Sequence, residues 1–419
     1  MFAHYMVAWP RGGRDARIAD YVAEFRDAQR RGIDGFALNC GGWSLSEPLY
    51  RSRILTMYRA AEELGDGFRL FVSADGKAQQ ELDQIVRTTA ELPAQLMVDG
   101  KPVLSSYALG GQDAARCEVL IAQADKLGAY FVPHFMPSTR EAEIGDVAAL
   151  EVASRCQSAS GYFYFGAAGL PDSLARSTRN LAEALKSSGK LFMASVTPYY
   201  RGLASGTNYR AFETNGFSGM ETEWRAAIEA RVDWIQIVTW NDWAESTYVS
   251  PIGSSTRKQV YDPRFGALLN HTAYLDASRY FIEWFKRGDA PEIERDVFYY
   301  FYRVHPIRTG LMKGEPTSSD TPPPPLVRAP LTAQIHVTAF LTEAAVLVIE
   351  QGGTHTTHKL CAGVNHVAVP ASPGAPRFVL VRNGNTIADK KGEESIRTDD
   401  YSGAFNYFSG SSALVREEN

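Results

Sequence analysis

Short apolar runs alternate with longer amphipathic stretches along the first three quarters of the chain. Most of these runs are apolar throughout, which is typical of strands in a parallel sheet covered on both faces. In the stretches between them, Ile18, Tyr21, Val22 and Phe25 recur at the i, i+3, i+4, i+7 spacing of a helix face. The predicted strands are residues 2–7, 35–40, 69–75, 102–109, 130–135, 161–166, 191–200 and 234–240.

Eight strands that alternate with helices predict an α/β fold of the (β/α)8 TIM barrel type, for which ~250 residues is a typical length. A doubly wound open sheet is the main structural alternative. The turn after the first predicted strand contains no GxGxxG sequence, so it gives no support for a dinucleotide site.

The last quarter of the chain follows a different pattern. Residues 315–330 are rich in Pro, Ser and Thr and are predicted to form a linker, because they suit neither a helix nor a central strand. Beyond them, β-branched runs are broken by Gly and Asn, and the sequence "RNGN" predicts a hairpin turn. We therefore predict a catalytic barrel at 1–314, a linker at 315–330 and a C-terminal β-sandwich at 331–419 that braces the barrel.

Composition narrows the class of partner. The chain has 419 residues, of which 45% are hydrophobic, and its net charge of -5 argues against nucleic acid, because phosphate binding needs a basic surface. Its apolar runs are shorter than the ~20 residues of a membrane-spanning helix, so we expect no membrane partner. The first residues lack the charged leader and cleavage site of a signal peptide. We expect a cytoplasmic protein, or an extracellular or periplasmic one whose leader is missing from this sequence.

Cysteine and histidine spacing predicts no metal site. The four cysteines are widely separated, and the eight histidines form no HxH or HExxH sequence. Ser105 and Ser106 have no GxSxG elbow around them, which disfavours a serine hydrolase. We expect a monomer.

Polar or aromatic side chains stand at nearly every predicted strand end. The active site of a TIM barrel lies at the C-terminal ends of its strands, so these residues are predicted to converge. They are rich in aromatic, amide and carboxylate groups and poor in Lys and Arg, which suits sugar rings better than phosphates. The candidates are His4, Asn39, Asp75, Tyr107, His134, Tyr199, Trp240, Asn241, Asp242, Trp243 and Glu245.

Within "VTWNDWAES" (238–246), Asp242 and Glu245 are the strongest candidates for catalysis. Two carboxyl groups flanking one bond are the basis of glycoside hydrolysis, and residues three apart in a loop can reach the ~5 to 10 Å separation it needs. Trp240 or Trp243 is expected to form an apolar wall that raises the pKa of one carboxyl, and Asn241 to bond a sugar hydroxyl. Alternatively, Asp242 caps a helix and Glu245 is solvated, but the following "STYVSPIGSS" indicates a loop.

Asp75 and Tyr199 each have a substrate-binding and a structural interpretation. Asp75 is either a third carboxylate that orients substrate or a turn residue of "ADGK". His4, Asn39 and His134 are interpreted as hydrogen-bonding groups of the pocket. Tyr199 either stacks on a sugar ring or packs on the rim of the barrel.

Five sequence blocks together resemble glycoside hydrolase family 71, the α-1,3-glucanases or mutanases. They are "MFAHYMVAW", "GIDGFALN", "LFVSAD", "DGKPVLSS" and "VTWNDWAES", and the tail "LCAGVNHVAVP…LVRNG" is similar to the β-sandwich that this family carries after its barrel. The resemblance implies an endo-acting hydrolase of α-1,3-glucan that works by inversion and without a cofactor. It also implies that Asp242 and Glu245 form the catalytic pair. We assign Glu245 as the general acid and Asp242 as the base, with the reverse assignment left open.

Two other functions are compatible with the same residues. A different glycan hydrolase on the same barrel, such as an endo-α-mannosidase-like enzyme, also has a strand-8 sequence rich in Trp and Asn. A carbohydrate-binding barrel without turnover is the non-enzyme alternative, and the presence of both Asp242 and Glu245 argues against it. The expected partner is a polysaccharide, an α-glucan by the resemblance. The carboxyl separation distinguishes the mechanisms, since ~5 Å indicates retention and more than ~6.5 Å inversion.

Overall fold

The computed structural model of the chain describes residues 1–46, 48–65, 67–138, 143–200, 210–253, 268–304, 326–327, 331–398 and 406–413. The chain divides into two compact units. The first consists of Met1–Thr197 and Thr222–Asp242, and the second of Pro198–Glu221 and Trp243–Asn419. Within the described ranges, no helix has the length and apolar character needed to cross a membrane.

A parallel β-sheet forms the centre of the first unit. Its strands are ordered β6-β5-β3-β2-β1-β10-β8-β7, and the short strand β4 pairs with β5 in antiparallel fashion. Helices follow most of the strands, so the predicted α/β class is confirmed. The strands are β1 (Phe2–Met6), β2 (Gly35–Cys40), β3 (Arg69–Ala74), β4 (Met97–Val98), β5 (Lys101–Ser106), β6 (Tyr130–Pro133), β7 (Gly161–Phe163), β8 (Leu191–Val196) and β10 (Trp234–Ile237). The helices are α1 (Ile18–Gln29), α2 (Tyr50–Leu64), the 3-10 helix η1 (Gly76–Gln80), α3 (Leu82–Thr89), α4 (Ala114–Lys126), α5 (Asp146–Arg155), α6 (Pro171–Ser187) and α7 (Phe217–Glu229), which spans the boundary of the units.

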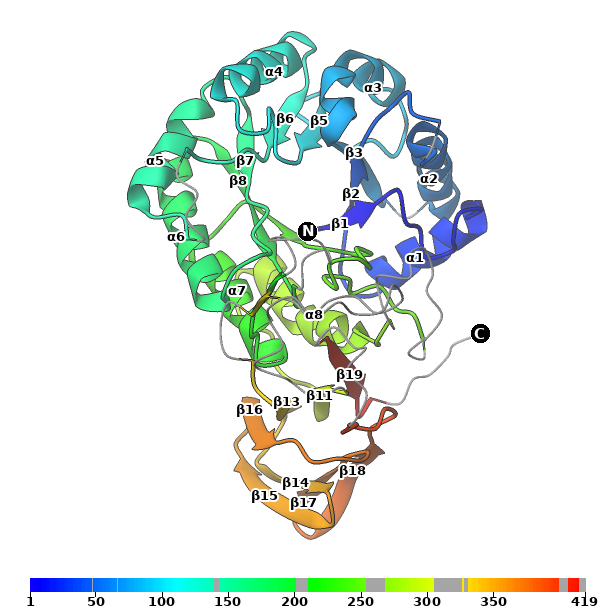
Figure 1. Cartoon of the computed structure of the whole chain (residues 1–419), viewed down its shortest axis with the longest axis vertical. Helices are drawn as coiled ribbons and strands as arrows, with labels where there is room; N and C mark the ends of the chain where they lie inside the picture. The colour runs from blue at the N-terminus through cyan, green and yellow to red at the C-terminus, as the bar shows by residue number, and fades with distance from the viewer. Residues whose placement is uncertain are drawn as a thin grey trace. The chain divides into compact units, whose positions relative to one another are not determined.

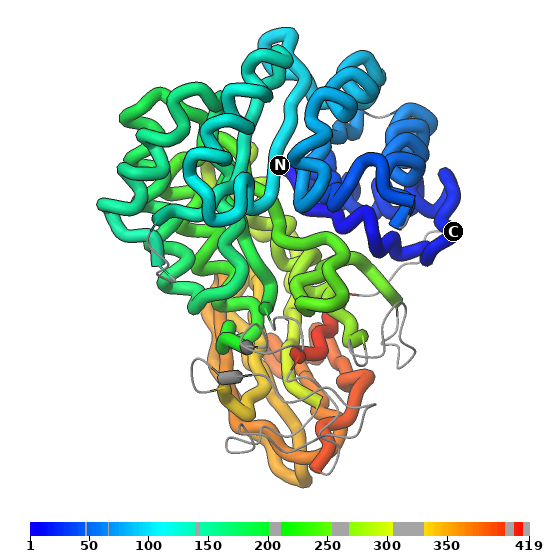
Figure 2. The backbone as a smooth tube through the Cα atoms, turned by 45° about the horizontal axis from the view of Figure 1, so that its top comes forward, coloured from blue at the N-terminus to red at the C-terminus, as the bar shows by residue number. Residues whose placement is uncertain are grey.

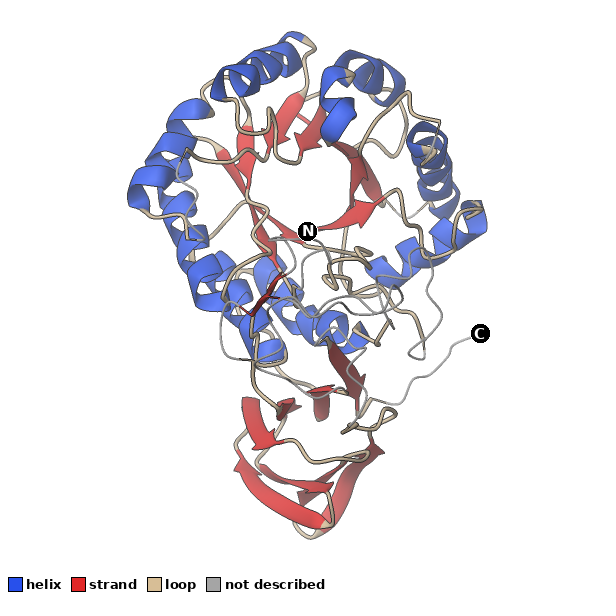
Figure 3. Ribbon diagram, viewed as in Figure 1, coloured by secondary structure: helices blue, strands red, loops and turns tan. Residues whose placement is uncertain are grey.

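The sheet is curled, with helices α1 to α6 on its outer side (Figure 1, Figure 3). Figure 2 shows the coiled helical segments of this part of the chain following one another from blue to green. All eight predicted strands are present, but several end earlier than predicted. Strand β7 ends at Phe163 and β10 at Ile237, each three residues before the predicted end. Candidates such as His134 and Trp240 therefore lie in the segments that follow the strands.

Aromatic rings pack together near the N-terminal ends of these strands. The ring centroid of Phe2 in β1 lies 5.2 Å from that of Phe71 in β3 and 5.3 Å from that of Trp234 in β10. The Trp234 ring lies 6.2 Å from that of Tyr130 in β6. Strands β1 and β3 are separated by β2, so their side chains meet across the concave face of the curled sheet. The four rings form a layer inside this end of the sheet.

Two antiparallel sheets and one long helix make up most of the described part of the second unit. The sheets have the orders β16-β13-β11-β19 and β15-β14-β17-β18. Side chains of both sheets, among them Tyr300, Ile335, Leu347 and Phe378, belong to one hydrophobic cluster. The elements are β9 (Arg210–Ala211), α8 (Thr272–Arg287), β11 (Val297–Arg303), β12 (Leu326–Val327), β13 (Gln334–Leu341), β14 (Ala345–Gln351), β15 (Thr354–Leu360), β16 (Gly363–Pro370), β17 (Arg377–Arg382), β18 (Asn385–Lys391) and β19 (Tyr407–Ser411).

Strand β11 lies inside the range 1–314 that the sequence assigns to the barrel, yet it pairs with β13 and β19. All its residues are buried, as expected for a strand in the middle of a sheet. Of the predicted linker at 315–330, only Leu326–Val327 are described, and they pair in parallel with Arg210–Ala211. The rest of the predicted linker lies outside the described residues.

Backbone geometry confirms the predicted hairpin and shows how two helices end. Arg382 of β17 pairs with Asn385 of β18, and the two residues between them, Asn383 and Gly384, have φ angles of 51° and 79°. Two consecutive positive φ angles are typical of the tight turn that Asn-Gly favours. Helix α8 ends at Gly288, where φ is 85°, a conformation that glycine adopts without strain. Helix α4 is likewise followed by Gly128, with φ 72°.

Candidate functional site

The register of the sheet decides which side chains face its concave side. Successive side chains of a strand point to opposite faces. Tyr5 points outward, because its hydroxyl donates a hydrogen bond to Glu24 of helix α1 (2.9 Å). His4 therefore points to the concave side. Asn39 of β2 pairs with Met6, two residues after His4, and so shares that face.

Three of the predicted residues come together in an aromatic cluster on this side. The ring of His4 lies 5.3 Å from that of Phe165, which follows β7. The Phe165 ring lies 4.7 Å from that of Tyr107, which follows β5, and Tyr107 stacks on His134 at 5.6 Å. Phe163 completes the group, 6.3 Å from His4 and 6.2 Å from His134. The structure thus joins His4, Tyr107 and His134, and it adds Phe163 and Phe165, which are not among the predicted site residues.

Both histidines of this cluster are buried and neutral. Burial, with His134 as a second cause, lowers the pKa of His4 to about 3. Burial lowers the pKa of His134 to about 4. The Nδ1 of His4 lies 3.3 Å from Nε2 of Gln236, while the Nδ1 of His134 lies 3.1 Å from the Phe163 carbonyl oxygen. A neutral imidazole offers one donor and one acceptor, which suits a hydroxyl-rich ligand.

Asn39 and Asp75 form a second pair on adjacent strands. The Asn39 amide donates to Asp75 Oδ2 at 3.3 Å, and the Gly76 backbone N–H donates to Asp75 Oδ1 at 2.7 Å. Burial raises the pKa of Asp75, although both hydrogen bonds act in the opposite direction. Asp75 therefore caps the short helix η1 and also stands beside a residue of the concave face. These bonds agree with the interpretation of Asp75 as a turn residue, while its role in orienting substrate stays a prediction.

Trp240 and Asn241 fasten the end of β10 to its neighbours. The indole N–H of Trp240 donates to Glu24 of helix α1 at 2.7 Å, and its ring packs 5.0 Å from Phe36 on the outer face. Asn241 accepts a hydrogen bond from Met6 N (2.7 Å) and donates to Met6 O (3.1 Å) and Trp9 O (2.8 Å). Both side chains are fully buried. The structure places them as supports of the segment, apart from the aromatic cluster.

Asp242 is the last residue of the first unit. It is 6% exposed, and its backbone N–H donates to the Thr239 hydroxyl at 2.8 Å. The hydroxyl bond fixes the turn between residues 239 and 242, so the direction of the chain at Asp242 is set by its own preceding residues. The peptide bond between Val238 and Thr239 is cis.

Glu245 lies in the second unit, next to a tyrosine that is not among the predicted residues. The Tyr200 hydroxyl donates to Glu245 Oε1 at 3.4 Å, and the Tyr200 ring packs 6.2 Å from Phe212. The predicted Tyr199, the preceding residue, is instead fully buried, 5.8 Å from the Tyr407 ring. Both tyrosines were visible in the sequence "TPYY", where the order of the two gives no indication of which one faces Glu245.

Trp243 is buried within the same unit. Its ring lies 4.9 Å from that of Tyr248, and its exposure is 2%. The short segment that contains Glu245 is thus held by packing at Trp243. This placement supports the segment rather than opening the indole face to solvent.

Four buried glutamates, Glu24, Glu213, Glu221 and Glu223, are not among the predicted site residues. Glu24 accepts the bonds of Tyr5 and Trp240, and burial raises its pKa. Glu223 of helix α7 accepts a hydrogen bond from Thr197 N at 2.9 Å, and burial raises its pKa well above the usual value. Glu213, described below, is paired with Arg303. A signal existed for Glu24, which stands three residues after Tyr21 on the apolar face of its helix. Where residues are described, no group of three His, Cys, Asp or Glu side chains is placed to hold a metal ion.

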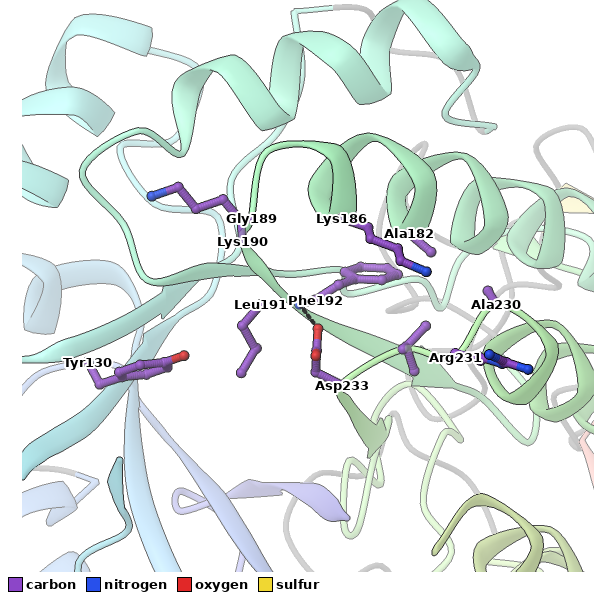
Figure 4. A pocket seen from close by; sticks show the side chains of 11 residues that line it. Tyr130, Ala182, Lys186, Gly189, Lys190, Leu191, Phe192, Ala230, Arg231 and Asp233 are labelled. Carbon is purple, nitrogen blue, oxygen red and sulfur yellow. Dashed lines mark hydrogen bonds between the residues drawn. The ribbon is translucent and has the colours of Figure 1, made fainter. Parts of the chain in front are cut away.

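A cavity of about 350 Å³ lies at the end of the sheet where the strands begin, near the first residues of β6 and β8 (Figure 4). Lys186, Arg231 and Asp233 line it together with Tyr130 and Phe192. The Asp233 carboxylate accepts a hydrogen bond from Phe192 N at 2.8 Å and so belongs to the local fold. The lining contains none of the predicted site residues.

Known proteins resemble this chain over almost its whole length. A glucan endo-1,3-alpha-glucosidase of Schizosaccharomyces pombe is 27% identical over 401 residues, covering 90% of this chain and 87% of that protein. A mutanase of Penicillium rubens is 25% identical over 430 residues, covering 98% and 88% respectively. Among solved structures, the GH99 endo-alpha-mannosidase of Bacteroides thetaiotaomicron in complex with bis-tris propane superposes with a TM-score of 0.53 and 15% identity, over 68% of this chain and 97% of that one. This last likeness concerns the fold alone.

The comparison with protein families gives a single description. Residues 1–417 match Glycosyl hydrolase family 71. The resemblance noted from the sequence blocks is thereby confirmed. Because the match extends over nearly the whole chain, this protein belongs to glycosyl hydrolase family 71.

Proposed function

We propose that this chain is an endo-acting glycoside hydrolase that cleaves α-1,3-glucan. The observation that carries the proposal is the family match over residues 1–417. Relatives that align along most of the chain are named glucan endo-1,3-alpha-glucosidase and mutanase, which supports the same substrate. The concave face contributes neutral imidazoles, an amide–carboxyl pair and aromatic rings, a set of groups that suits the hydroxyls and apolar faces of sugar rings.

The proposed chemistry uses Asp242 and Glu245. Glu245 acts as general acid and protonates the oxygen of the leaving sugar, while Asp242 acts as general base and activates a water molecule, with inversion at the anomeric carbon. The Tyr200 hydroxyl, 3.4 Å from Glu245, is available to orient the acid. Asp75, whose pKa is raised by burial, is proposed as a third carboxyl that orients substrate. His4, Asn39, Tyr107 and His134 are proposed to contact the sugar.

A different role is proposed for four of the predicted aromatic and amide residues. Trp240 and Asn241 use their polar atoms on Glu24 and on the backbone of residues 6 and 9. Tyr199 and Trp243 are buried against other aromatic rings. We propose that these residues hold the site in place rather than bind substrate directly.

The finer architecture belongs to the same proposal. We infer that the curled sheet closes into an eight-stranded TIM barrel through its end strands β6 and β7. In support, Ser160, next to β7, donates its backbone N–H to Phe131 O of β6 at 2.9 Å and accepts from Phe131 N at 3.1 Å with its hydroxyl. We further propose that the two antiparallel sheets form an accessory β-sandwich, and that β11 belongs to it.

The test is the release of reducing sugar from insoluble α-1,3-glucan. Asp242→Asn and Glu245→Gln are expected to lower kcat by about 10²- to 10⁴-fold, the range that general acid–base catalysis contributes. Glu62→Gln, an exposed carboxyl on helix α2, serves as the matched control and should retain wild-type activity. Unchanged turnover in both site variants would remove Asp242 and Glu245 from the mechanism.

Two further readouts separate the alternatives. Proton NMR of the first product should show the β-anomer from an α-linked substrate if the enzyme inverts, and the α-anomer if it retains. Release of sugar from an α-mannan, with no release from α-1,3-glucan, would point to the endo-α-mannosidase-like alternative. Binding to glucan without release would favour a carbohydrate-binding protein.

A further inference from the structure

One histidine of the second unit connects the segment of Glu245 to the C-terminal sheet. His271 immediately precedes helix α8 and is fully buried. Its Nδ1 lies 2.9 Å from the Tyr248 carbonyl oxygen. Its Nε2 lies 2.8 Å from Oδ1 of Asn406 and 3.0 Å from the carbonyl oxygen of Tyr407, at the start of β19. The ring therefore bridges two segments that are more than a hundred residues apart in the sequence.

Tyr248 links this histidine to the turn that carries Glu245. The Tyr248 ring stacks on His271, with centroids 4.3 Å apart and planes inclined by 11°. Trp243 packs on the Tyr248 ring at 4.9 Å, and the Tyr248 hydroxyl donates to Leu269 O at 2.6 Å. Trp243 and Tyr248 stand on either side of Glu245 in the sequence. The position of this turn is therefore fixed at both ends by contacts that lead to His271.

The other side of the histidine is anchored in strand β19. Ser409 donates both its backbone N–H and its hydroxyl to Asn270 O, each at 2.8 Å. The Ser409 hydroxyl also accepts from Ala273 N at 3.3 Å. Because β19 pairs with β11, the residues around His271 are connected to the centre of the first antiparallel sheet.

Each ring nitrogen of His271 contacts a different part of the second unit. Burial lowers the pKa of His271 to about 4, so the ring is neutral near pH 7 and only one nitrogen carries a hydrogen. The Tyr248 carbonyl can only accept, so the contact at 2.9 Å is a hydrogen bond when Nδ1 carries the hydrogen. Nε2 faces two oxygens, Asn406 Oδ1 and Tyr407 O, so each ring nitrogen has an acceptor within reach. The link to the turn is carried by the Nδ1 contact together with the stacking of the Tyr248 and His271 rings.

We propose that His271 is a positioning residue: it holds Tyr248, and through it the turn containing Glu245, against the C-terminal sheet. The inference rests on the proposed function, in which Glu245 is the general acid. His271 does not touch the reacting atoms. Its effect on the reaction is the placement of Glu245, and small displacements of a catalytic group can reduce turnover strongly.

Two substitutions of His271 test the contacts of its two ring nitrogens separately. Asn in His271→Asn can place an amide N–H near the position of Nδ1, within reach of Tyr248 O. Gln in His271→Gln places its amide near the position of Nε2 and leaves Tyr248 O without the contact at Nδ1. We expect kcat on α-1,3-glucan to fall by about tenfold or more in His271→Gln with KM nearly unchanged, and by no more than about threefold in His271→Asn.

A control on the same helix separates positioning from general loss of stability. Ser278 is buried on α8 and donates its hydroxyl to Tyr274 O at 2.7 Å. Ser278→Ala is expected to lower Tm while leaving kcat per folded molecule unchanged. If His271→Gln lowers Tm but keeps its kcat, as Ser278→Ala should, His271 is only structural and the proposal is wrong.

Hydrogen exchange followed by mass spectrometry gives an answer that does not depend on activity. In His271→Gln, peptides that cover residues 243–250 should exchange faster than in the wild type, while peptides from α1 and α2 should not change. Unchanged exchange at 243–250 would overturn the link between His271 and the turn, whatever the activity. Failure of the wild type to cleave glucan, with faster exchange in His271→Gln, would overturn the proposed function and leave the link supported.

Discussion

Single residues near Asp242 show how far chemistry can be predicted from a sequence. The residue types of "VTWNDWAES" indicated a catalytic site, and that assignment stays a prediction. Orientation was not predictable, because strand β10 ends at Ile237 and the alternation of faces stops there. Trp240 and Asn241 consequently turn to Glu24 and to the backbone of β1, which the sequence could not indicate. The same holds for Tyr199 and Tyr200, adjacent residues with different surroundings.

The buried pair of Glu213 and Arg303 leads to a prediction about acid stability. The two side chains are 8% and 2% exposed and form an ion pair at 2.9 Å. Burial alone would raise the pKa of Glu213, but Arg303, the Tyr407 hydroxyl and backbone N–H groups outweigh it and bring the pKa to about 2. A carboxyl whose pKa is lower in the folded state stabilises the fold above its unfolded pKa, ~4.3, and loses this contribution as pH falls toward 2.

We therefore expect the free energy of unfolding to decrease between about pH 4.3 and pH 2 more steeply in the wild type than in Glu213→Gln. At pH 7 the variant should be less stable, since it leaves Arg303 buried without its charged partner, a loss of ~3–5 kcal/mol for pairs of this kind. Urea unfolding at pH 7, 4 and 3 measures both effects. Parallel pH profiles for the two proteins would show that Glu213 does not contribute to the acid transition.

At the scale of elements, the strands were predicted well because each is buried on both faces and reads as a continuous apolar run. The Asn383-Gly384 turn was predicted for a local reason, because Asn and Gly favour the positive φ angles that they adopt here. Strand β11 was not assigned to its sheet. Its sequence, "VFYYFYR", is as apolar as a barrel strand, and its partners β13 and β19 are distant in sequence. Pairing partners of this kind cannot be deduced from local pattern.

Gly35, the first residue of β2, offers a test of sheet packing. A Cβ atom at this position would overlap the carbonyl oxygen of Arg69, the first residue of the neighbouring strand β3. Gly35→Ala is therefore expected to destabilise the protein by about 1–3 kcal/mol, the usual cost of overpacking. Gly145→Ala is the control, because its Cβ would meet no atom within 4 Å and its φ is -75°. Equal Tm values for the two variants in thermal unfolding would contradict the packing argument.

At the scale of the whole molecule, the chain divides into two compact units whose boundaries in the sequence follow Thr197, Glu221 and Asp242. The predicted domain boundary at 315–330 stays a prediction, based on the composition of the Pro-rich stretch. The hydrophobic cluster that contains the side chains of β11 also contains side chains of β13, β17 and β19. Composition does not reveal such contacts between strands that are distant in sequence.

A fragment ending at residue 314 is consequently expected to misfold. It would retain β11 but lose β13 and β19, and would expose Phe298, Tyr300 and Tyr302, which are buried in the shared cluster. Each such side chain contributes ~1.5–3 kcal/mol when buried. Size-exclusion chromatography and binding of a hydrophobic dye should show aggregated or loosely packed protein. A monomeric fragment with a cooperative thermal transition would show that the first 314 residues fold independently.

The aromatic layer of Phe2, Phe71, Trp234 and Tyr130 bears on how a glucan chain would enter and leave the proposed barrel. These rings pack on one another at the end of the sheet where the strands begin, so in the proposed barrel we expect them to narrow that end. In the proposed barrel, we therefore expect polymer to arrive and products to leave on the side where the strands end. A long strand of glucan would then lie across the opening with both of its ends outside, which permits cleavage at internal linkages without threading from a terminus.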